Sequence, residues 1–253
     1  MDRNKFTEFH IVSLPACAST NTYIKERVNE LSENTVVIAD IQTDGRGRLG
    51  NKWVADKGAL SMSVLFRNIP SAQNMTIISA VAVCQSLYQL YGIKAGIKWT
   101  NDVICENKKI CGILCESAIK CSSDVNTDQS YVICGIGLNV NQGSEFFEEN
   151  GLSDGASLCS LYGREFDKLE IGLYILRKTA VLQGMAFSEV IMMYRELCVT
   201  LGKSVKLVQN NCEITAYAKD IDENGRLICE NESGEFVVNS GVVRVRGING
   251  EYV

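Results

Sequence analysis

The chain has 253 residues, of which 46% are hydrophobic and 22% are charged, and its formal net charge is −5. This length and composition are enough to bury a hydrophobic core and to form one large domain, or a large domain and a small one. The acidic balance argues against a constitutive nucleic-acid-binding protein, because no broad basic surface is expected.

Eleven cysteines lie within apolar segments, in an odd number and without a Cys-x-x-Cys pair, and His10 is the only histidine. A zinc site is therefore not expected, and the cysteines are interpreted as buried apolar residues in a reducing compartment. The first eight residues lack the apolar segment of a signal peptide. The longest apolar stretch, residues 76–93, contains polar side chains that indicate a buried helix. We expect a cytoplasmic protein without a membrane partner.

The first predicted strand, residues 8–14, ends at Pro15, and residues 23–31 have the apolar spacing of a helix. Between them stand Ser19, Thr20 and Asn21, which are typical of a helix N-cap. Because this polar run is longer than a cap requires, it could also bind a small polar group in a pocket. Capping and binding both remain open at this point.

The next predicted strand, residues 36–42, leads into a glycine-rich basic loop, residues 45–53. Glycines at 45, 47 and 50 allow positive φ angles and close approach to a ligand, while Arg46 and Arg48 supply two permanent charges. The loop therefore favours binding of an anion.

The spacing of the three glycines also occurs in dinucleotide-binding folds, but such a fold would need a helix after the loop and an acidic residue about 20 positions further along the chain. The segment after the loop is strand-like and contains no such residue, so the remaining alternative is a solvated basic turn.

Residues 59–66 and 96–104 are predicted strands, and residues 72–91 form a predicted core helix. A turn at residues 106–108 returns the chain as a hairpin partner, residues 109–116. Lys98 and Asp102 fall on one face of the predicted strand and Lys109 lies beside them. Either lysine alone could extend to solvent, but two lysines and a carboxylate in one hairpin favour a site.

After a polar loop at residues 120–129, residues 131–140 form a strand with glycines at 135 and 137. One face of this strand lacks side chains there, so a ligand or another chain segment can lie against its backbone; a β-bulge is the alternative. Helical segments are predicted from residue 156, at 168–182 and at 188–200. From residue 204 short strands and turns alternate, which indicates a small β-barrel beginning near 201.

Taken together, the polar and glycine-rich segments resemble the biotin protein ligase family, whose members attach biotin to the carrier domains of carboxylases. The resemblance covers the whole chain and depends on the order and spacing of the segments. The most specific matches are Ser19-Thr20-Asn21, Gly45-Arg46-Gly47-Arg48-Leu49-Gly50 with Trp53, Lys98-Trp99-Thr100-Asn101-Asp102, Lys109 with Gly112-Ile113-Leu114, and Gly135-Ile136-Gly137-Leu138-Asn139.

The resemblance implies an α/β (α+β) fold, with a mixed-sheet catalytic domain at residues 1–200 and an SH3-like β-barrel at 201–253. It implies ATP, Mg²⁺ and biotin as substrates or cofactors, and a biotin carboxyl carrier domain as partner, in a monomer or homodimer. The implied biotin-binding residues are Ser19, Thr20, Asn21, Gln42, Arg46, Gly47, Arg48, Lys109, Gly112 and Leu114. The implied ATP-binding residues are Arg46, Arg48, Trp53, Lys98 and Asn139, and the implied catalytic residues are Arg48, Lys98, Asp102 and Lys109, with Asp102 also assigned to Mg²⁺.

The chemistry of such a ligase agrees with these charges, because the carboxylate of biotin must meet the phosphates of ATP. At ~4 Å and an effective dielectric constant of ~20, one pair of unit charges interacts by ~4 kcal/mol. Several fixed cations must therefore face the reacting atoms, and Arg46, Arg48, Lys98 and Lys109 are the candidates. The adenylate product must also be shielded from water, which a glycine loop closing over it would achieve.

The sequence departs from the family at Thr100, where proline is common. The Ser19 motif also begins too early for a preceding winged helix, so DNA binding is not expected. Three alternatives remain: a lipoate or octanoate ligase or transferase of the same fold, a non-catalytic module that holds biotinyl-adenylate, and a small single-strand nucleic-acid binder. The last conflicts with the acidic balance and with the lack of stacked aromatic residues in residues 201–253.

Overall fold

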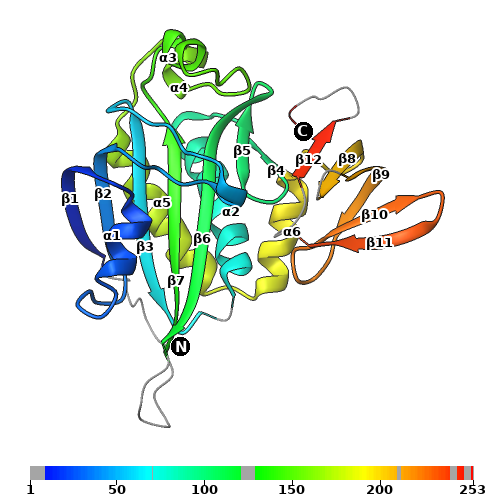
Figure 1. Ribbon diagram of the computed structural model, residues 1–253, viewed down its shortest axis with the longest axis horizontal. Helices are drawn as coiled ribbons and strands as arrows, with labels where there is room; N and C mark the ends of the chain where they lie inside the picture. The colour runs from blue at the N-terminus through cyan, green and yellow to red at the C-terminus, as the bar shows by residue number, and fades with distance from the viewer. Residues whose placement is uncertain are drawn as a thin grey trace.

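The computed structural model describes residues 9–69, 71–120, 129–209, 212–239, 244–247 and 252. These residues form a large mixed sheet with helices on its faces and a smaller sheet near the C-terminus (Figure 1). The expected α/β class with a mixed sheet and a small C-terminal β structure is confirmed.

The large sheet has the strand order β1-β2-β3-β7-β6-β5-β4. β1 and β2 are parallel, and the other neighbouring strands are antiparallel, so the sheet is mixed. The strands are β1 (His10–Cys17), β2 (Thr35–Gln42), β3 (Ala59–Arg67), β4 (Gly96–Lys98), β5 (Asp102–Cys105), β6 (Lys108–Lys120) and β7 (Gln129–Asn139).

Alternation of side chains along the strands divides the sheet into two faces. On one face, Cys134 and Ile136 of β7 belong to the main core, together with the long helix α2 (Ala72–Tyr91). On the other face, Ile133 of β7 packs with Ile24 of the short helix α1 (Thr20–Glu26) in a smaller cluster. The glycines of β7 lie at odd positions and therefore open the α1 face of the sheet.

Helix α2 has the bounds that its periodicity predicts. The Ser71 side chain accepts a hydrogen bond from Gln73 N at its start, and Gly92 ends it with φ 70°. No helix in the described part of the chain is long and apolar enough to cross a membrane. The remaining helices are α3 (Ser144–Glu149), α4 (Leu158–Tyr162), α5 (Lys168–Gln183) and α6 (Phe187–Leu197).

Three sequence predictions of local structure need correction, and one helix was not predicted. β1 continues through Pro15, because it is an edge strand in which the missing N–H of proline costs no ladder bond. Helix α1 ends at Glu26, earlier than predicted, and helix α3 was not predicted. The predicted strand 96–104 is two strands, β4 and β5, joined by a tight turn that contains a cis peptide bond between Trp99 and Thr100. The predicted loop 120–129 falls almost entirely outside the described residues.

The smaller sheet is antiparallel, with the strand order β11-β10-β9-β8-β12. It packs against the larger unit: Trp99 Nε1 donates a hydrogen bond to Gly225 O at 3.1 Å, and Arg195 Nε donates to Ile221 O at 2.8 Å. Its strands are β8 (Ser204–Gln209), β9 (Cys212–Ile221), β10 (Leu227–Asn231), β11 (Gly234–Val238) and β12 (Arg244–Gly247).

Candidate active site

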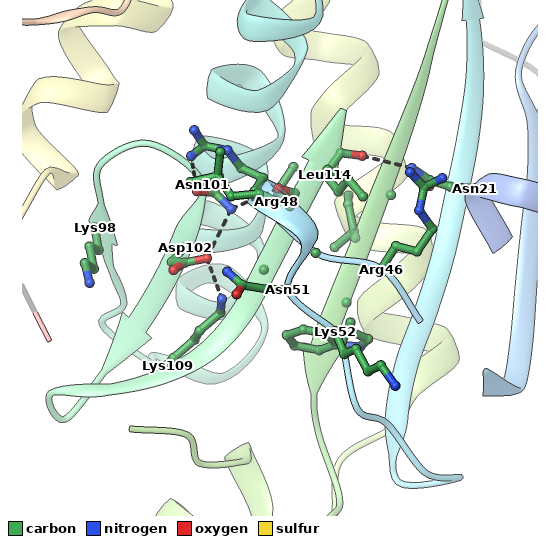
Figure 2. Close-up of a pocket in the computed structure, with 18 of the residues that line it drawn as sticks. Asn21, Arg46, Arg48, Asn51, Lys52, Lys98, Asn101, Asp102, Lys109 and Leu114 are labelled. Atoms are coloured by element: carbon green, nitrogen blue, oxygen red, sulfur yellow. Dashed lines mark hydrogen bonds and ion pairs between the residues drawn. The ribbon is translucent and has the colours of Figure 1, made fainter. Parts of the chain in front are cut away.

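A cavity of about 440 Å³ lies on the α1 face of the large sheet. The start of α1, the loop at residues 45–53, the β4–β5 turn, the glycines of β6 and β7, and the C-terminal segment all contribute to its wall. Figure 2 shows charged side chains from these separate segments around one space. Of the predicted site residues, the cavity is lined by Ser19, Thr20, Asn21, Gln42, Arg46, Gly47, Arg48, Trp53, Lys98, Asp102, Lys109, Gly112 and Leu114.

One end of the cavity is lined by the uncharged polar side chains at the start of α1 and the end of β2. Ser19 stands at the N-cap position of α1, but its hydroxyl makes no capping hydrogen bond. Thr20 N donates to Gln42 Oε1 at 2.8 Å, which fixes the start of α1 against the end of β2. The polar run before α1 therefore contributes side chains to a cavity, and capping alone does not account for it.

Ser63 of β3, which sequence analysis did not single out, lies behind this polar end. Its hydroxyl is fully buried and is 2.6 Å from both Thr20 Oγ1 and Asn21 Oδ1. Asn21 in turn donates through Nδ2 to Leu114 O at 3.2 Å and to Glu116 Oε2 at 2.9 Å. Buried side chains connected in this way hold their orientation before a ligand arrives.

The basic loop folds back on itself. Gly47 N donates to Asn51 O at 2.8 Å, and Trp53 N donates to Gly45 O at 2.9 Å. A Cβ atom at residue 45 would lie 2.2 Å from Trp53 O, so this close approach requires glycine. No α-helix opens at the loop, which contains only a short 3₁₀ turn at Arg48–Gly50, as expected for a chain without a dinucleotide fold.

The two arginines of the loop have different partners (Figure 2). Arg46 Nη2 lies 3.2 Å from Glu116 Oε1. Arg48 Nη1 donates to Asn101 Oδ1 at 2.6 Å, which connects the loop to the β4–β5 turn. Burial lowers the pKa of Arg48, and the nearby Asp102 carboxylate opposes this shift. Both guanidinium groups thus border the same cavity from the loop.

The floor of the cavity is formed where two glycines face each other. Gly112 of β6 and Gly137 of β7 are cross-strand partners, and the Trp53 ring lies against both. A Cβ atom at Gly137 would be 2.4 Å from Trp53 Cε2. The expectation that something lies against the bare backbone of β7 is confirmed, and the contacting groups are the side chains of Trp53 and, at Gly135, of Asn21.

The side chains of Lys98, Asp102 and Lys109 line the same cavity, as predicted, although the strands that carry Lys98 and Asp102 differ from the prediction. Lys98 and Asp102 are cross-strand partners in β4 and β5, and do not lie on one continuous strand. Lys109 Nζ lies 2.7 Å from Asp102 Oδ1, and Asn101 Nδ2 donates to the same oxygen at 3.2 Å. Burial lowers the pKa of Lys98 to about 7, and Asp102 partly offsets this effect.

Asn139 is the one predicted site residue outside the main cavity. It lies in an adjacent cavity of about 190 Å³, whose lining also includes Trp53 and Lys109. Its Oδ1 accepts a hydrogen bond from Gln142 Nε2 at 3.2 Å. Because Trp53 and Lys109 line both cavities, the second is a side chamber of the first.

The C-terminal segment adds residues that sequence analysis missed. Val245 and Arg246 of β12, together with Tyr252, line the main cavity. These positions carry no local motif, and only the tertiary fold brings them to the site.

The described residues contain no group of three or more His, Cys, Asp or Glu side chains that could hold a metal by themselves. Asp102 is the carboxylate available in the cavity wall.

Comparison with known proteins was consistent across family models, sequences and structures. Residues 14–139 match the biotin/lipoate A/B protein ligase family, and residues 200–246 match the biotin protein ligase C-terminal domain. A biotin--[acetyl-CoA-carboxylase] ligase of Mycobacterium tuberculosis is 31% identical, with 85% of this chain and 80% of the relative covered. The bifunctional ligase/repressor BirA of Bacillus subtilis is 30% identical, with 89% and 70% covered.

Among solved structures, the biotin protein ligase of Aquifex aeolicus in complex with biotin and ATP superposes with a TM-score of 0.80 at 29% identity. The superposition covers 94% of this chain and 99% of that one. The likeness therefore spans both sheets and the cavity between the loop and the β4–β5 turn.

Proposed function

Because the chain belongs to the biotin protein ligase family, we propose that it activates biotin with ATP as biotinyl-5′-AMP and transfers the biotinyl group to a lysine of a carboxylase carrier domain. The observation that carries the proposal is the arrangement of the cavity, in which Arg46, Arg48, Lys98 and Lys109 line one space together with the polar side chains Ser19, Thr20, Asn21 and Gln42. Such a cavity suits a ligand with a polar neutral head and an anionic tail that must meet a second anion.

The polar end is the proposed site for the ureido ring of biotin. A ureido group has one carbonyl acceptor and two N–H donors, so it needs partners of both kinds. Ser19 presents a hydroxyl free of capping, and Thr20 and Gln42 form a fixed pair beside it. Asn21, Gly112 and Leu114 complete the wall of this end.

The cationic end is the proposed site of the first chemical step. An oxygen of the biotin carboxylate attacks the α-phosphorus of ATP, the bond to the β-phosphate oxygen breaks, and pyrophosphate leaves. Each cation within ~4 Å of an anion offsets ~4 kcal/mol of repulsion at an effective dielectric constant of ~20. Lys109 would lie between the two reactants, and Arg46 and Arg48, which line the same cavity, would cover them from the loop.

The side chamber is the proposed adenine site. Trp53 offers an aromatic face at its entrance, and Asn139 offers a buried amide within it. Stacking on the indole and hydrogen bonding to the amide would together fix the base. Lys109, which lines both cavities, would then face the α-phosphate.

Mg²⁺ would enter with the nucleotide, since it is commonly held by one or two carboxylates together with substrate phosphates. Asp102 is the carboxylate in the cavity wall that would hold the ion, in exchange for its contacts with Lys109 at Oδ1 and with Tyr252 at Oδ2. When bound, the ion would neutralise charge on the leaving pyrophosphate.

In the second step, the amine of the carrier lysine attacks the carbonyl carbon of biotinyl-AMP, and AMP leaves. The loop at residues 45–53 would cover the adenylate and exclude water until the carrier arrives. The hydrogen bond from Arg48 to Asn101 supports this role, because it holds the loop across the cavity.

We further assign residues 1–200 to catalysis and residues 201–253 to a separate C-terminal domain. We also assign the protein to the cytoplasm, where the free thiols of the described cysteines would persist.

Incubation with ATP, Mg²⁺, biotin and a carrier domain tests the proposal through biotin incorporation, followed by mass spectrometry of the carrier. Pyrophosphate–ATP exchange with biotin or lipoate measures the first step alone. We expect exchange with biotin and little with lipoate, and incorporation into the carrier separates the enzyme from a module that only holds the adenylate. Exchange that is faster with lipoate would contradict the assignment.

A further inference from the structure

Tyr252 brings an aromatic side chain from the end of the chain into the cationic end of the cavity. The Lys98 ammonium lies over its ring, with 3.4 Å between Nζ and the ring centroid. The Tyr252 hydroxyl donates a hydrogen bond to Asp102 Oδ2. The guanidinium of Arg246 lies 5.1 Å from the same ring. Tyr252 therefore contacts both members of the Lys98–Asp102 pair.

Lys98 and Asp102 would be expected to form an ion pair, because they are directly opposite each other in adjacent antiparallel strands. Among the ion pairs of the described residues, however, Asp102 is joined to Lys109 through Oδ1, and Lys98 has none. Tyr252 occupies the second oxygen, Oδ2, which Lys98 would otherwise use. The tyrosine thus stands between the lysine and the carboxylate.

This arrangement leaves the ammonium of Lys98 without an ion-pair partner among the described residues, and therefore available to a ligand. An aromatic face attracts an ammonium group but has no net charge. Lys98 is only 5% exposed, so the ring gives a buried cation a favourable contact without neutralising it. An ion pair with Asp102 would instead direct the ammonium towards the carboxylate and away from a ligand.

We propose that Tyr252 is a positioning residue for ATP, which keeps Lys98 from pairing with Asp102 so that the lysine faces the phosphates. This inference rests on the proposed function. Tyr252 acts through the two residues that it contacts, and no contact with substrate is assigned to it. Tyr252 thereby becomes part of the machinery that prepares the nucleotide site.

The test is the steady-state kinetics of biotin-dependent pyrophosphate–ATP exchange by the full chain. In Tyr252→Ala, Lys98 can pair with Asp102, and we expect KM for ATP to rise by about tenfold or more, with a smaller change in kcat. Tyr252→Leu keeps an apolar side chain and should show the same rise. Tyr252→Phe keeps the ring and loses the hydroxyl, so its KM should lie between those of the wild type and the alanine variant.

Two measurements separate positioning from general damage. The Kd for biotin, determined by calorimetry without ATP, should be the same in all Tyr252 variants. Tyr217→Ala removes an aromatic residue of β9 that is 46% exposed, and it should retain wild-type kinetics.

An unchanged KM for ATP in both Tyr252→Ala and Tyr252→Leu would overturn the inference. A lower KM would overturn it too, because Tyr252 would then be a side chain that ATP must displace. Weakened biotin binding would show a structural role only. Absence of exchange in the wild type would instead contradict the proposed function itself.

Discussion

Gly137 and Trp53 are in such close contact that no other residue fits at position 137 without moving the ring. A Cβ atom there would lie 2.4 Å from Trp53 Cε2 and 2.7 Å from Trp53 Nε1. Gly112 lies directly opposite Gly137 on β6, and the Trp53 ring also packs against this glycine. The position of the indole at the junction of both cavities therefore depends on a glycine in a neighbouring strand.

Gly137→Ala should displace Trp53 and damage the proposed adenine site. We expect KM for ATP to rise by about tenfold or more, and the free energy of unfolding to fall by ~1–3 kcal/mol through overpacking. Kinetics and chemical denaturation measure the two effects. Gly172→Ala in α5 is the matched control, because its Cβ would lie 3.5 Å from Leu60 Cδ2, an ordinary contact, and alanine favours the helix. Equal behaviour of the two variants would argue against a role for the Trp53 position.

Lys109→Ala should abolish most adenylate formation while the protein remains folded. We expect a loss on the order of 10²–10³-fold in the rate of exchange, because a fixed cation that faces developing charge is removed. Lys108→Ala, one residue earlier in β6, removes an exposed ammonium that donates to Ser153 O and should leave exchange near the wild-type rate. Near wild-type turnover by Lys109→Ala would exclude this lysine from the mechanism.

Arg48→Gly should release biotinyl-AMP from the enzyme, because the variant loses both a charge and the bond to Asn101. The expected result is labelling of bystander lysines in added serum albumin, detected by streptavidin blotting. Asn101→Ala removes the tether but keeps the guanidinium, so its labelling shows how much of the effect comes from loop anchoring. Bystander labelling as low as that of the wild type in Arg48→Gly would count against the loop as a cover.

The affinity for ATP should depend on pH through Lys98. Burial places its pKa at about 7, below the usual value for lysine, so the free enzyme loses this cation as pH rises above 7. Binding of phosphates favours the charged form, and KM for ATP should therefore rise by up to about tenfold per pH unit between pH 7 and 9. In Lys98→Arg the charge persists, and this slope should disappear. An equal slope in both proteins would assign the titration to another group.

Local sequence patterns anticipated much of the fold and most of the cavity. The apolar periodicity of residues 72–91 predicts α2, and the glycines at 135 and 137 predict a strand that something covers. The pattern could not show the break between Lys98 and Asp102, because β4 and β5 are only three and four residues long and together have the length of one ordinary strand.

Two other residues of the site could not be predicted from the sequence, for a different reason. Ser63 is one of two serines in an otherwise apolar run, and Tyr252 belongs to no recognisable motif. Each gains its role from contacts with residues far away in sequence, Ser63 with Thr20 and Asn21, and Tyr252 with Lys98 and Asp102. Such roles follow from tertiary structure, which local spacing does not encode.

Two serines of β3 offer a paired test of the polar network behind the proposed biotin site. Ser61 and Ser63 are both buried, and they differ in their hydrogen bonds. Ser63 Oγ contacts Thr20 and Asn21, whereas Ser61 Oγ is buried and has no hydrogen-bond partner among the described residues. Ser63→Ala leaves the buried Asn21 Oδ1 without its hydrogen-bond donor, while Thr20 Oγ1 keeps its bond to Gln42, and the loss costs ~1–3 kcal/mol of stability.

We expect Ser63→Ala to weaken biotin binding by about tenfold, since Thr20 and Asn21 lose their fixed orientation. Ser61→Ala removes an unsatisfied hydroxyl and should be neutral or stabilising, with an unchanged Kd for biotin. Calorimetry with biotin and urea denaturation of both variants measure these differences. If the two substitutions have the same effect on biotin affinity, the bonds of Ser63 do not organise the pocket, and the orientation of α1 must depend on Gln42 and Glu116 instead.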